Sequence, residues 1–364
     1  MEHTLNVLIS DTSATIAAAN ARAPNEEPTL TPVVDVSGFL FPDTQGADIK
    51  RSEAVDAVLV ALRPPAAGIF RITGHGIDAS SIDRARCAFY ALEDKKGTTA
   101  VADAPENIVG FRGYAPLGTE KTGDVYNVSS SADKCSCFSV GPPDGGEQFE
   151  PNLFPAHDDF KEAFESIYYL FEALDHAVYA LFNAALERDA PRGEPRNEIL
   201  KIPFGGARRG LLRAKHYWLT EQSVHRAELM AAHADVTAFT VLCTDGPGLE
   251  VASQVVDSAA SADDANAFEW RPAPKLGPGE LFVNTGEVIR AISNDRFRPC
   301  IHRVAHVETA RARMSLAWFS AACYAQGADA PLVLPVTEPG EPVKFPPWRP
   351  EDFTEHVIAK MRGR

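Results

Sequence analysis

The chain has 364 residues, 45% of them hydrophobic, which is enough to bury a sizeable core in one large domain or two ordinary ones. Its 35 Lys and Arg residues against 50 Asp and Glu residues give a formal net charge of -15 at pH 7. An acidic surface without a Lys/Arg cluster repels phosphate backbones and anionic lipids, so the composition disfavours nucleic acid and membrane surfaces as partners.

The cysteines and the first residues of the chain indicate a cytoplasmic protein. The six cysteines show no disulfide-framework spacing, and the lone C-x-C of Cys135 and Cys137 lacks the second ligand pair of a zinc site. The N-terminal residues have neither the basic region nor the long apolar region of a signal peptide, and no run of 18 apolar residues offers a membrane span. We expect a cytoplasmic monomer that acts on a small molecule.

Helices are predicted for much of the first half. Residues 1–31, rich in Ala, Thr, Asn and Pro, are expected to form a loosely held N-terminal arm. Residues 97–157 are rich in Gly, Pro and Ser, and their length favours a functional loop or short strands over a structureless connection. The spacing of apolar residues predicts helices at 52–63, near 79–94 and at 158–188, with short strands after Pro32 and at 68–77.

The second half has the texture of a β protein. Residues 210–325 carry several short apolar or alternating runs separated by Gly, Pro, Asp and Asn, which is typical of a barrel or a double-sheet jelly roll. The Ala-, Ser- and Asp-rich run 252–269 is expected to be mostly an exposed insertion. We predict a mainly β fold with packed helices, in a single domain over 32–364. Its parts are a helix-rich portion (32–190), a jelly-roll core (191–325) and a C-terminal segment (326–364).

One pair of residues in the β-rich part suggests a metal site. His233 and Asp235 are two apart, so on a strand they share a face at about 7 Å separation. His302, which follows a polar turn at 293–295, is the candidate third ligand. Two imidazoles and one carboxylate leave three positions of an octahedral ion open, as oxygen activation at iron(II) requires. A zinc hydrolase uses the same donor set, so the triad alone leaves the metal open.

Further strand residues suggest an anion site. Arg313 and Ser315 place a guanidinium and a hydroxyl on one face, where they can bind a carboxylate such as the distal one of 2-oxoglutarate. Alternation also puts Arg213, Lys215 and Tyr217 on one face. The two cations suit an anionic substrate or cosubstrate there; the alternative is that they face solvent.

Several longer motifs resemble, in order, those of the isopenicillin N synthase-like 2-oxoglutarate-dependent dioxygenases. HADVTAFTVLCTDGPGLEV is similar to the family's H-x-D…T-x-L…D…G-L-Q-V segment. WRPAPKLGPGELFVNTGEVIRAISNDRFRPCIHRV is similar to its W-x-x-V-x-P-x-P-G…N-x-G-D…S-N…H-R-V segment. TPVVDVSG and GIFRITGHGI resemble its I-P-V-I-D-L-S and G-F-F-x-V-x-N-H-G-I, and FPPWRPEDFTEHVIAKM resembles its closing helix. The resemblance spans about residues 32–360.

The resemblance implies a double-stranded β-helix core and an enzyme that uses iron(II), 2-oxoglutarate and O2, with ascorbate as an accessory reductant. It implies that His233, Asp235 and His302 are the catalytic iron ligands. The residues implied to bind 2-oxoglutarate are Arg313, Ser315 and Tyr217. By analogy with the family, Phe111, Tyr114, Phe138 and Phe319 are expected to face the substrate. Arg213 and Lys215 are added as substrate candidates because of their charge and strand alternation.

The sequence also departs from the family pattern. Lys215 stands where the family's N-Y-Y-P motif has Asn, Trp218 and Leu219 replace its prolines, and Glu250 replaces a Gln. The expected reaction is the hydroxylation, desaturation or cyclisation of a small organic molecule in specialised metabolism, with release of succinate and CO2. Two alternatives remain: an iron oxidase of the same family that does not use 2-oxoglutarate, and a non-catalytic small-molecule binder on the same fold.

Overall fold

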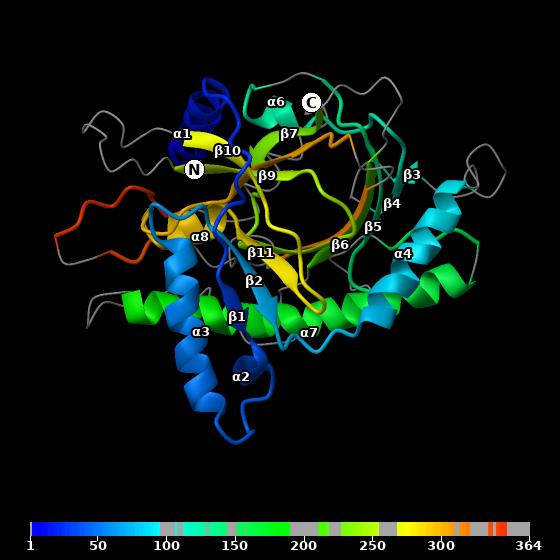
Figure 1. The fold of residues 1–364 in the computed structure, drawn as a ribbon, viewed down its shortest axis with the longest axis horizontal. Helices are drawn as coiled ribbons and strands as arrows, with labels where there is room; N and C mark the ends of the chain where they lie inside the picture. Colours follow the sequence, from blue (N-terminus) through cyan, green and yellow to red (C-terminus); the bar gives the residue numbers. More distant parts are fainter. Residues whose placement is uncertain are drawn as a thin grey trace.

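Two β-sheets and a set of packed helices make up the computed structural model (Figure 1). The predicted mainly β fold with a jelly-roll core is confirmed. None of the helices among the described residues has both the length and the apolar character needed to cross a membrane. The structure describes residues 2–94, 106–107, 112–128, 131–143, 151–156, 158–189, 210–217, 227–254, 268–308, 313–320, 334–337 and 340–347.

The larger sheet has nine strands in the order β1-β2-β11-β8-β13-β6-β5-β4-β3. Neighbouring strands are antiparallel except β1 and β2, which are parallel. Strands β3, β4 and β5 fall in the segment 97–157, where short strands were one of the two expectations. The bounds are β1 Val33–Asp35, β2 Ile69–Thr73, β3 Glu106–Asn107, β4 Arg112–Ala115, β5 Cys135–Val140, β6 Leu211–Tyr217, β8 Phe239–Thr244, β11 Leu281–Thr285 and β13 Arg313–Phe319.

The smaller sheet has four antiparallel strands in the order β10-β9-β12-β7. Its bounds are β7 Glu228–Ala234, β9 Leu249–Gln254, β10 Phe268–Pro272 and β12 Ile301–Ala305. Strands β9 and β10 pair at the two ends of the run 252–269, so these ends are strand rather than exposed insertion. Residues 255–267 of that run lie outside the described residues.

A 32-residue helix, α7 (Asp158–Asp189), lies across the outer face of the larger sheet (Figure 1). Its apolar residues recur every three or four positions, so one stripe can pack on the sheet. Phe182 stacks on Phe239 of β8 at 5.3 Å between ring centroids, and Tyr168 meets Trp318 of β13 edge-on at 4.9 Å. This contact covers one face of the sheet, so the other face is left for the smaller sheet and the site.

Shorter helices complete the fold. The predicted helices at 52–63 and near 79–94 are confirmed as α3 (Ala47–Leu62) and α4 (Ala79–Asp94), and both pack against α7. The helix α8 (Glu287–Ile292) was not predicted. The remaining short helices in the described part of the chain are α2 (Ser37–Leu40) and α6 (Thr122–Val125).

The N-terminal segment differs from the loosely held arm expected over residues 1–31. Residues Glu2–Asn20 form α1, which packs against β10 and β7. Thr12 Oγ1 donates a hydrogen bond to Glu287 Oε1 at 2.6 Å, and Arg290 pairs with Asp11 at 2.6 Å. Alanine-rich sequence has a high helix propensity, and partners on α8 fix this helix in place. The arm was misjudged because those partners are far away in the sequence.

Candidate metal and cosubstrate site

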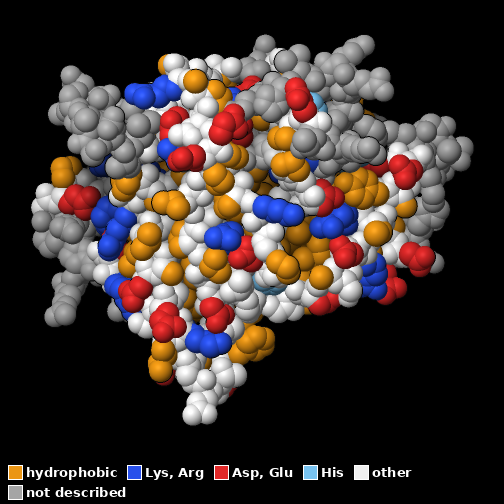
Figure 2. Space-filling view, in the orientation of Figure 1, with side chains coloured by type: hydrophobic (Ala, Val, Ile, Leu, Met, Phe, Trp, Pro, Cys, Tyr) orange, Lys and Arg blue, Asp and Glu red, His pale blue; other side chains and the backbone are white. Residues whose placement is uncertain are grey.

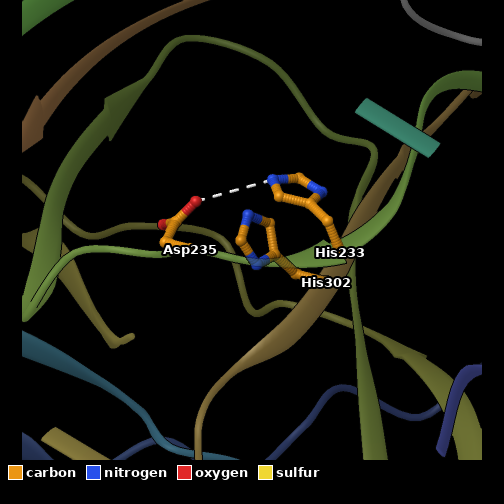
Figure 3. A group of neighbouring side chains, drawn as sticks. All are labelled: His233, Asp235 and His302. Atoms are coloured by element: carbon orange, nitrogen blue, oxygen red, sulfur yellow. Dashed lines mark ion pairs between the residues drawn. The ribbon is translucent and has the colours of Figure 1, made fainter. Parts of the chain in front are cut away.

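Three side chains converge on the inner side of the smaller sheet (Figure 3). His233 lies near the end of β7, Asp235 follows that strand directly, and His302 on β12 is the register partner of His233. One potential ligand atom from each residue lies within 4.8 Å of the others. His233 Nε2 is 3.5 Å from Asp235 Oδ1, and the two imidazole centroids are 4.2 Å apart. The predicted triad is therefore brought together, with His233 and Asp235 buried and His302 partly buried.

A β-bulge shapes this end of the smaller sheet. Between the pairs His302–His233 and Val304–Met230 the register of β12 on β7 shifts, so that two residues on β12 span three on β7. A bulge of this kind redirects side chains that alternation alone would send to opposite faces. His233 and Met230 therefore both point into the interior although they are three residues apart.

Backbone carbonyls fix the tautomer of both imidazoles. His233 Nδ1 donates to the carbonyl of Ala231 at 2.8 Å, and His302 Nδ1 donates to the carbonyl of Cys300 at 3.0 Å. A carbonyl only accepts, so the hydrogen of each neutral ring is on Nδ1 and the Nε2 lone pair is free for a metal. Burial lowers the pKa of His302 to about 4, which keeps the ring neutral at physiological pH.

Hydrogen bonds also hold the Asp235 carboxylate. Oδ2 accepts from Thr240 Oγ1 at 2.6 Å and from Asn284 Nδ2 at 2.7 Å, which leaves Oδ1 directed at His233. Burial alone would raise the pKa of Asp235, but His302, His233 and Thr240 lower it below its usual range, so the group is ionised. Thr240 and Asn284 fall in the motifs T-x-L and N-x-G, but they were not among the predicted site residues.

This donor set fits a divalent transition metal. Two neutral nitrogens and one anionic oxygen face one point, and each donor residue is oriented by a second hydrogen bond. The three residues can hold such an ion from one side, which leaves its other side to ligands from outside the protein. Zinc accepts the same donors, so the triad alone does not distinguish zinc from iron(II). The neighbouring anion site provides further evidence on the reaction.

The strand β13 supplies that anion site. Arg313 is only 2% exposed, and its Nε and Nη1 atoms are buried without a hydrogen-bond partner among the described residues. Its guanidinium lies over the ring of Tyr217, 4.5 Å from the centroid. Ser315, two residues further on, is also buried. A buried guanidinium with unpaired nitrogens is costly unless a ligand pairs with it, and a carboxylate fits its planar fork.

The predicted alternation on β6 is confirmed, and its charged residues are buried rather than facing solvent. Arg213, Lys215 and Tyr217 are direct register partners of Ala317, Ser315 and Arg313 on β13, all on the inner face. Arg213 is engaged there, since it donates to Ser139 Oγ at 3.0 Å and forms an ion pair with Glu120. Lys215 lacks such a close acidic partner; its Nζ is 3.9 Å from Glu120 Oε2.

The aromatic positions expected to face the substrate fare differently. The prediction for Phe138 was wrong, because this residue lies on the outer face of β5. Its ring packs on Phe160 and Phe164 of α7, at 4.7 and 5.1 Å between ring centroids. Tyr114 on β4 is the register partner of Phe138 and shares that outer face, so the prediction for Tyr114 was also wrong. Phe319 is partly buried against the inner apolar cluster that includes Leu242. Phe111 lies outside the described residues.

Residues 210–322, which contain both the triad and the anion site, match the family described as the 2OG-Fe(II) oxygenase superfamily. The chain belongs to this superfamily. It is an iron(II)- and 2-oxoglutarate-dependent dioxygenase, and iron(II) and 2-oxoglutarate are its cofactors. The resemblance to the isopenicillin N synthase-like dioxygenases is confirmed by the relatives that follow.

Plant and fungal proteins are similar over most of the chain. Gibberellin 20 oxidase 5 of Arabidopsis thaliana is 27% identical over 82% of this chain and 70% of its own length. The 2-oxoglutarate-Fe(II) type oxidoreductase hxnY of Emericella nidulans is 26% identical over 93% of this chain and 92% of its own. The crystal structure of the dioxygenase for auxin oxidation in rice has a TM-score of 0.61 at 22% identity, over 91% of this chain and 95% of that one.

Proposed function

We propose that this oxygenase oxidises a small organic molecule and releases succinate and CO2, with His233, Asp235 and His302 as its iron ligands. Arg313 and Ser315 hold the distal carboxylate of 2-oxoglutarate. The observation that carries the proposal is the buried Arg313 guanidinium, whose Nε and Nη1 lack a partner among the described residues, in the same interior as the triad.

The side chains divide the work. Iron(II), when bound, supplies the activation of O2. The two histidines offer Nε2, while Thr240 and Asn284 keep the Asp235 carboxylate ionised and aimed. The guanidinium of Arg313 and the Ser315 hydroxyl orient the cosubstrate through its far end. The apolar cluster around Leu242, Val251 and Phe282 excludes water from the interior, which strengthens these polar contacts.

The class of substrate is small and organic. The name of the Arabidopsis relative specifies oxidation of a gibberellin, which supports a role for this chain in specialised metabolism by analogy. On the face in Figure 2, basic side chains are scattered among acidic ones rather than gathered into a nucleic-acid-binding patch, as judged on the described residues.

Within this proposal the chain is a cytoplasmic monomer with one domain over 32–364. Tyr217 touches the cosubstrate, and ascorbate keeps the iron reduced.

The test is coupled turnover. The purified protein with Fe(II), 2-oxoglutarate and O2 is screened against small organic molecules for substrate-stimulated succinate. His233→Ala and His302→Ala should abolish that succinate, while an exposed control such as Arg84→Ala should not change it. Substrate oxidation that proceeds without 2-oxoglutarate would assign the chain to the cosubstrate-independent oxidases. Ligand binding without any oxidation in the presence of iron would make it a non-catalytic binder. Either result overturns the proposal.

A further inference from the structure

A second cation lies beside the proposed cosubstrate grip. Lys215 on β6 and Ser315 on β13 are direct register partners. On each strand they are two residues from the neighbouring inward-facing pair, Tyr217 and Arg313. Directly paired residues in antiparallel strands have Cβ atoms about 5 Å apart. Lys215 therefore adjoins the hydroxyl that we expect to bind 2-oxoglutarate, on the same face of the sheet.

The Lys215 ammonium is buried with few acceptors. Its side chain is 4% exposed, and its Nζ lies 3.6 Å from the thioether sulfur of Met230. Glu120 Oε2 is 3.9 Å away, beyond hydrogen-bonding distance. A thioether is a weak acceptor, whereas an ammonium has three N–H groups to satisfy. Among the described residues these contacts give it no hydrogen-bonded oxygen, which is costly for a buried charge unless a ligand provides one.

The acidic side chains nearby form their hydrogen bonds with other partners. Glu120 forms its short ion pair with Arg213. Asp133 accepts hydrogen bonds from the Thr122 hydroxyl and from the backbone N–H of Ala231 at 3.4 Å. Burial raises the pKa of Asp133, whereas the charge of Lys215 lowers it. The ammonium therefore shares Glu120 with Arg213 and has no hydrogen bond to a carboxylate oxygen among the described residues.

The ammonium faces the interior that contains the triad. Its sulfur contact, Met230, lies on β7 three residues before His233, and the bulge turns both of these side chains inward. Lys215 therefore lies beside Ser315 and faces the interior that also contains the triad.

We propose that the substrate is an organic acid and that the Lys215 ammonium binds its carboxylate. This inference rests on the proposed function, in which Arg313 and the metal already engage the two ends of 2-oxoglutarate. A third carboxylate would give the ammonium its missing oxygen acceptors. A neutral amide of the same shape would leave the buried charge unpaired, and sites of that kind reject the wrong analogue strongly. Lys215 is therefore the residue that determines specificity for acids.

The experiment uses the full chain with Mn(II) in place of iron and the non-reactive analogue N-oxalylglycine at saturation. Three acids (benzoic, cinnamic and decanoic) and their three primary amides are titrated by calorimetry. Lys215→Met keeps the side-chain volume and removes the charge, and Lys215→Arg keeps the charge. Urea denaturation of both variants checks folding. The affinity of each variant for 2-oxoglutarate is measured in parallel.

We expect at least one acid to bind the wild type tenfold or more tightly than its amide. Lys215→Met should abolish that ratio with less than a threefold change in 2-oxoglutarate affinity, and Lys215→Arg should retain part of it. Equal binding of acids and amides by the wild type would overturn the inference. The inference would also be overturned if Lys215→Met kept the preference for acids over amides, or if it instead lowered the affinity for 2-oxoglutarate tenfold. Failure of the wild type to bind 2-oxoglutarate at all would count against the proposed function itself.

Discussion

The guanidinium of Arg313 lies over the ring of Tyr217, 4.5 Å from its centroid, with Nε and Nη1 buried and unpaired among the described residues. Stacking on an aromatic face stabilises a cation without using its N–H groups, so the hydrogen-bonding fork stays available. The protein thereby pre-forms a carboxylate site at the cost of burying a charge. Two opposite effects of removing that charge follow.

Arg313→Met should weaken 2-oxoglutarate binding and leave the protein no less stable. Loss of one partner of a buried charge pair costs about 2 kcal/mol or more, which is about thirtyfold in affinity. The free protein loses the contact with the Tyr217 ring but also a buried charge with unpaired N–H groups, so its urea midpoint should stay the same or rise. Calorimetry with Mn(II) and urea titrations measure the two effects. A lower midpoint with unchanged affinity would mean that the guanidinium is structural.

The hydrogen bond from Thr240 to Asp235 should tune metal affinity. Thr240→Val keeps the shape of the side chain and removes the 2.6 Å hydrogen bond to Oδ2. Loss of such an outer partner weakens metal binding by about 10- to 100-fold, because the carboxylate is less well oriented. Mn(II) titration followed by electron paramagnetic resonance measures it. Thr237→Val is the matched control, since Thr237 bonds the backbone carbonyl of Phe239 instead; equal losses in both variants would contradict the role of Thr240.

Phe138 should matter for stability and not for ligands. It is fully buried between β5 and α7, where Phe160 and Phe164 contact its ring. Phe138→Ala should therefore lower the free energy of unfolding by about 3–5 kcal/mol. Its affinity for 2-oxoglutarate, measured well below the unfolding transition, should stay within twofold of wild type. Phe138→Leu, which loses less volume, should lie between the two in stability. A clear loss of affinity for 2-oxoglutarate would contradict this prediction and show that Phe138 contributes to ligand binding.

The contrast between the triad and Phe138 shows what sequence can predict here. His233 with Asp235, and Arg313 with Ser315, could be paired by local spacing, because residues two apart on a strand share a face. Strand β5 is buried on both faces, so its sequence has no polar–apolar alternation to reveal which side points inward. The inward parity of Cys135, Cys137 and Ser139 is fixed only by pairing with β6. Phe138 was therefore assigned to the wrong face.

Contacts distant in sequence account for the other misses. Asn284 is 49 positions from Asp235 and reaches it because β11 pairs with β8, whose Thr240 binds the same carboxylate oxygen. The helix α1 has its polar anchors on α8, with Thr12 and Glu287 separated by 275 positions. Local composition suggested a loosely held arm there because it contains no information on such partners. Motif order, by contrast, recovered the family, because each motif is locally complete.

The docking of α1 is a final testable feature. Glu287 is fully buried, and Thr12 donates a 2.6 Å hydrogen bond to its Oε1. Thr12→Val keeps the shape of the side chain but leaves that oxygen without its donor. An unsatisfied buried acceptor costs about 1–3 kcal/mol, so the urea midpoint should fall accordingly. The loss should shrink in Glu287→Leu, where no carboxylate remains to satisfy, and the double-mutant cycle isolates the coupling. Exposed Ser10→Ala on the same helix should change stability by less than about 0.5 kcal/mol. A coupling near zero would show that α1 is held by its apolar residues, such as Leu8 and Ile16, rather than by this bond.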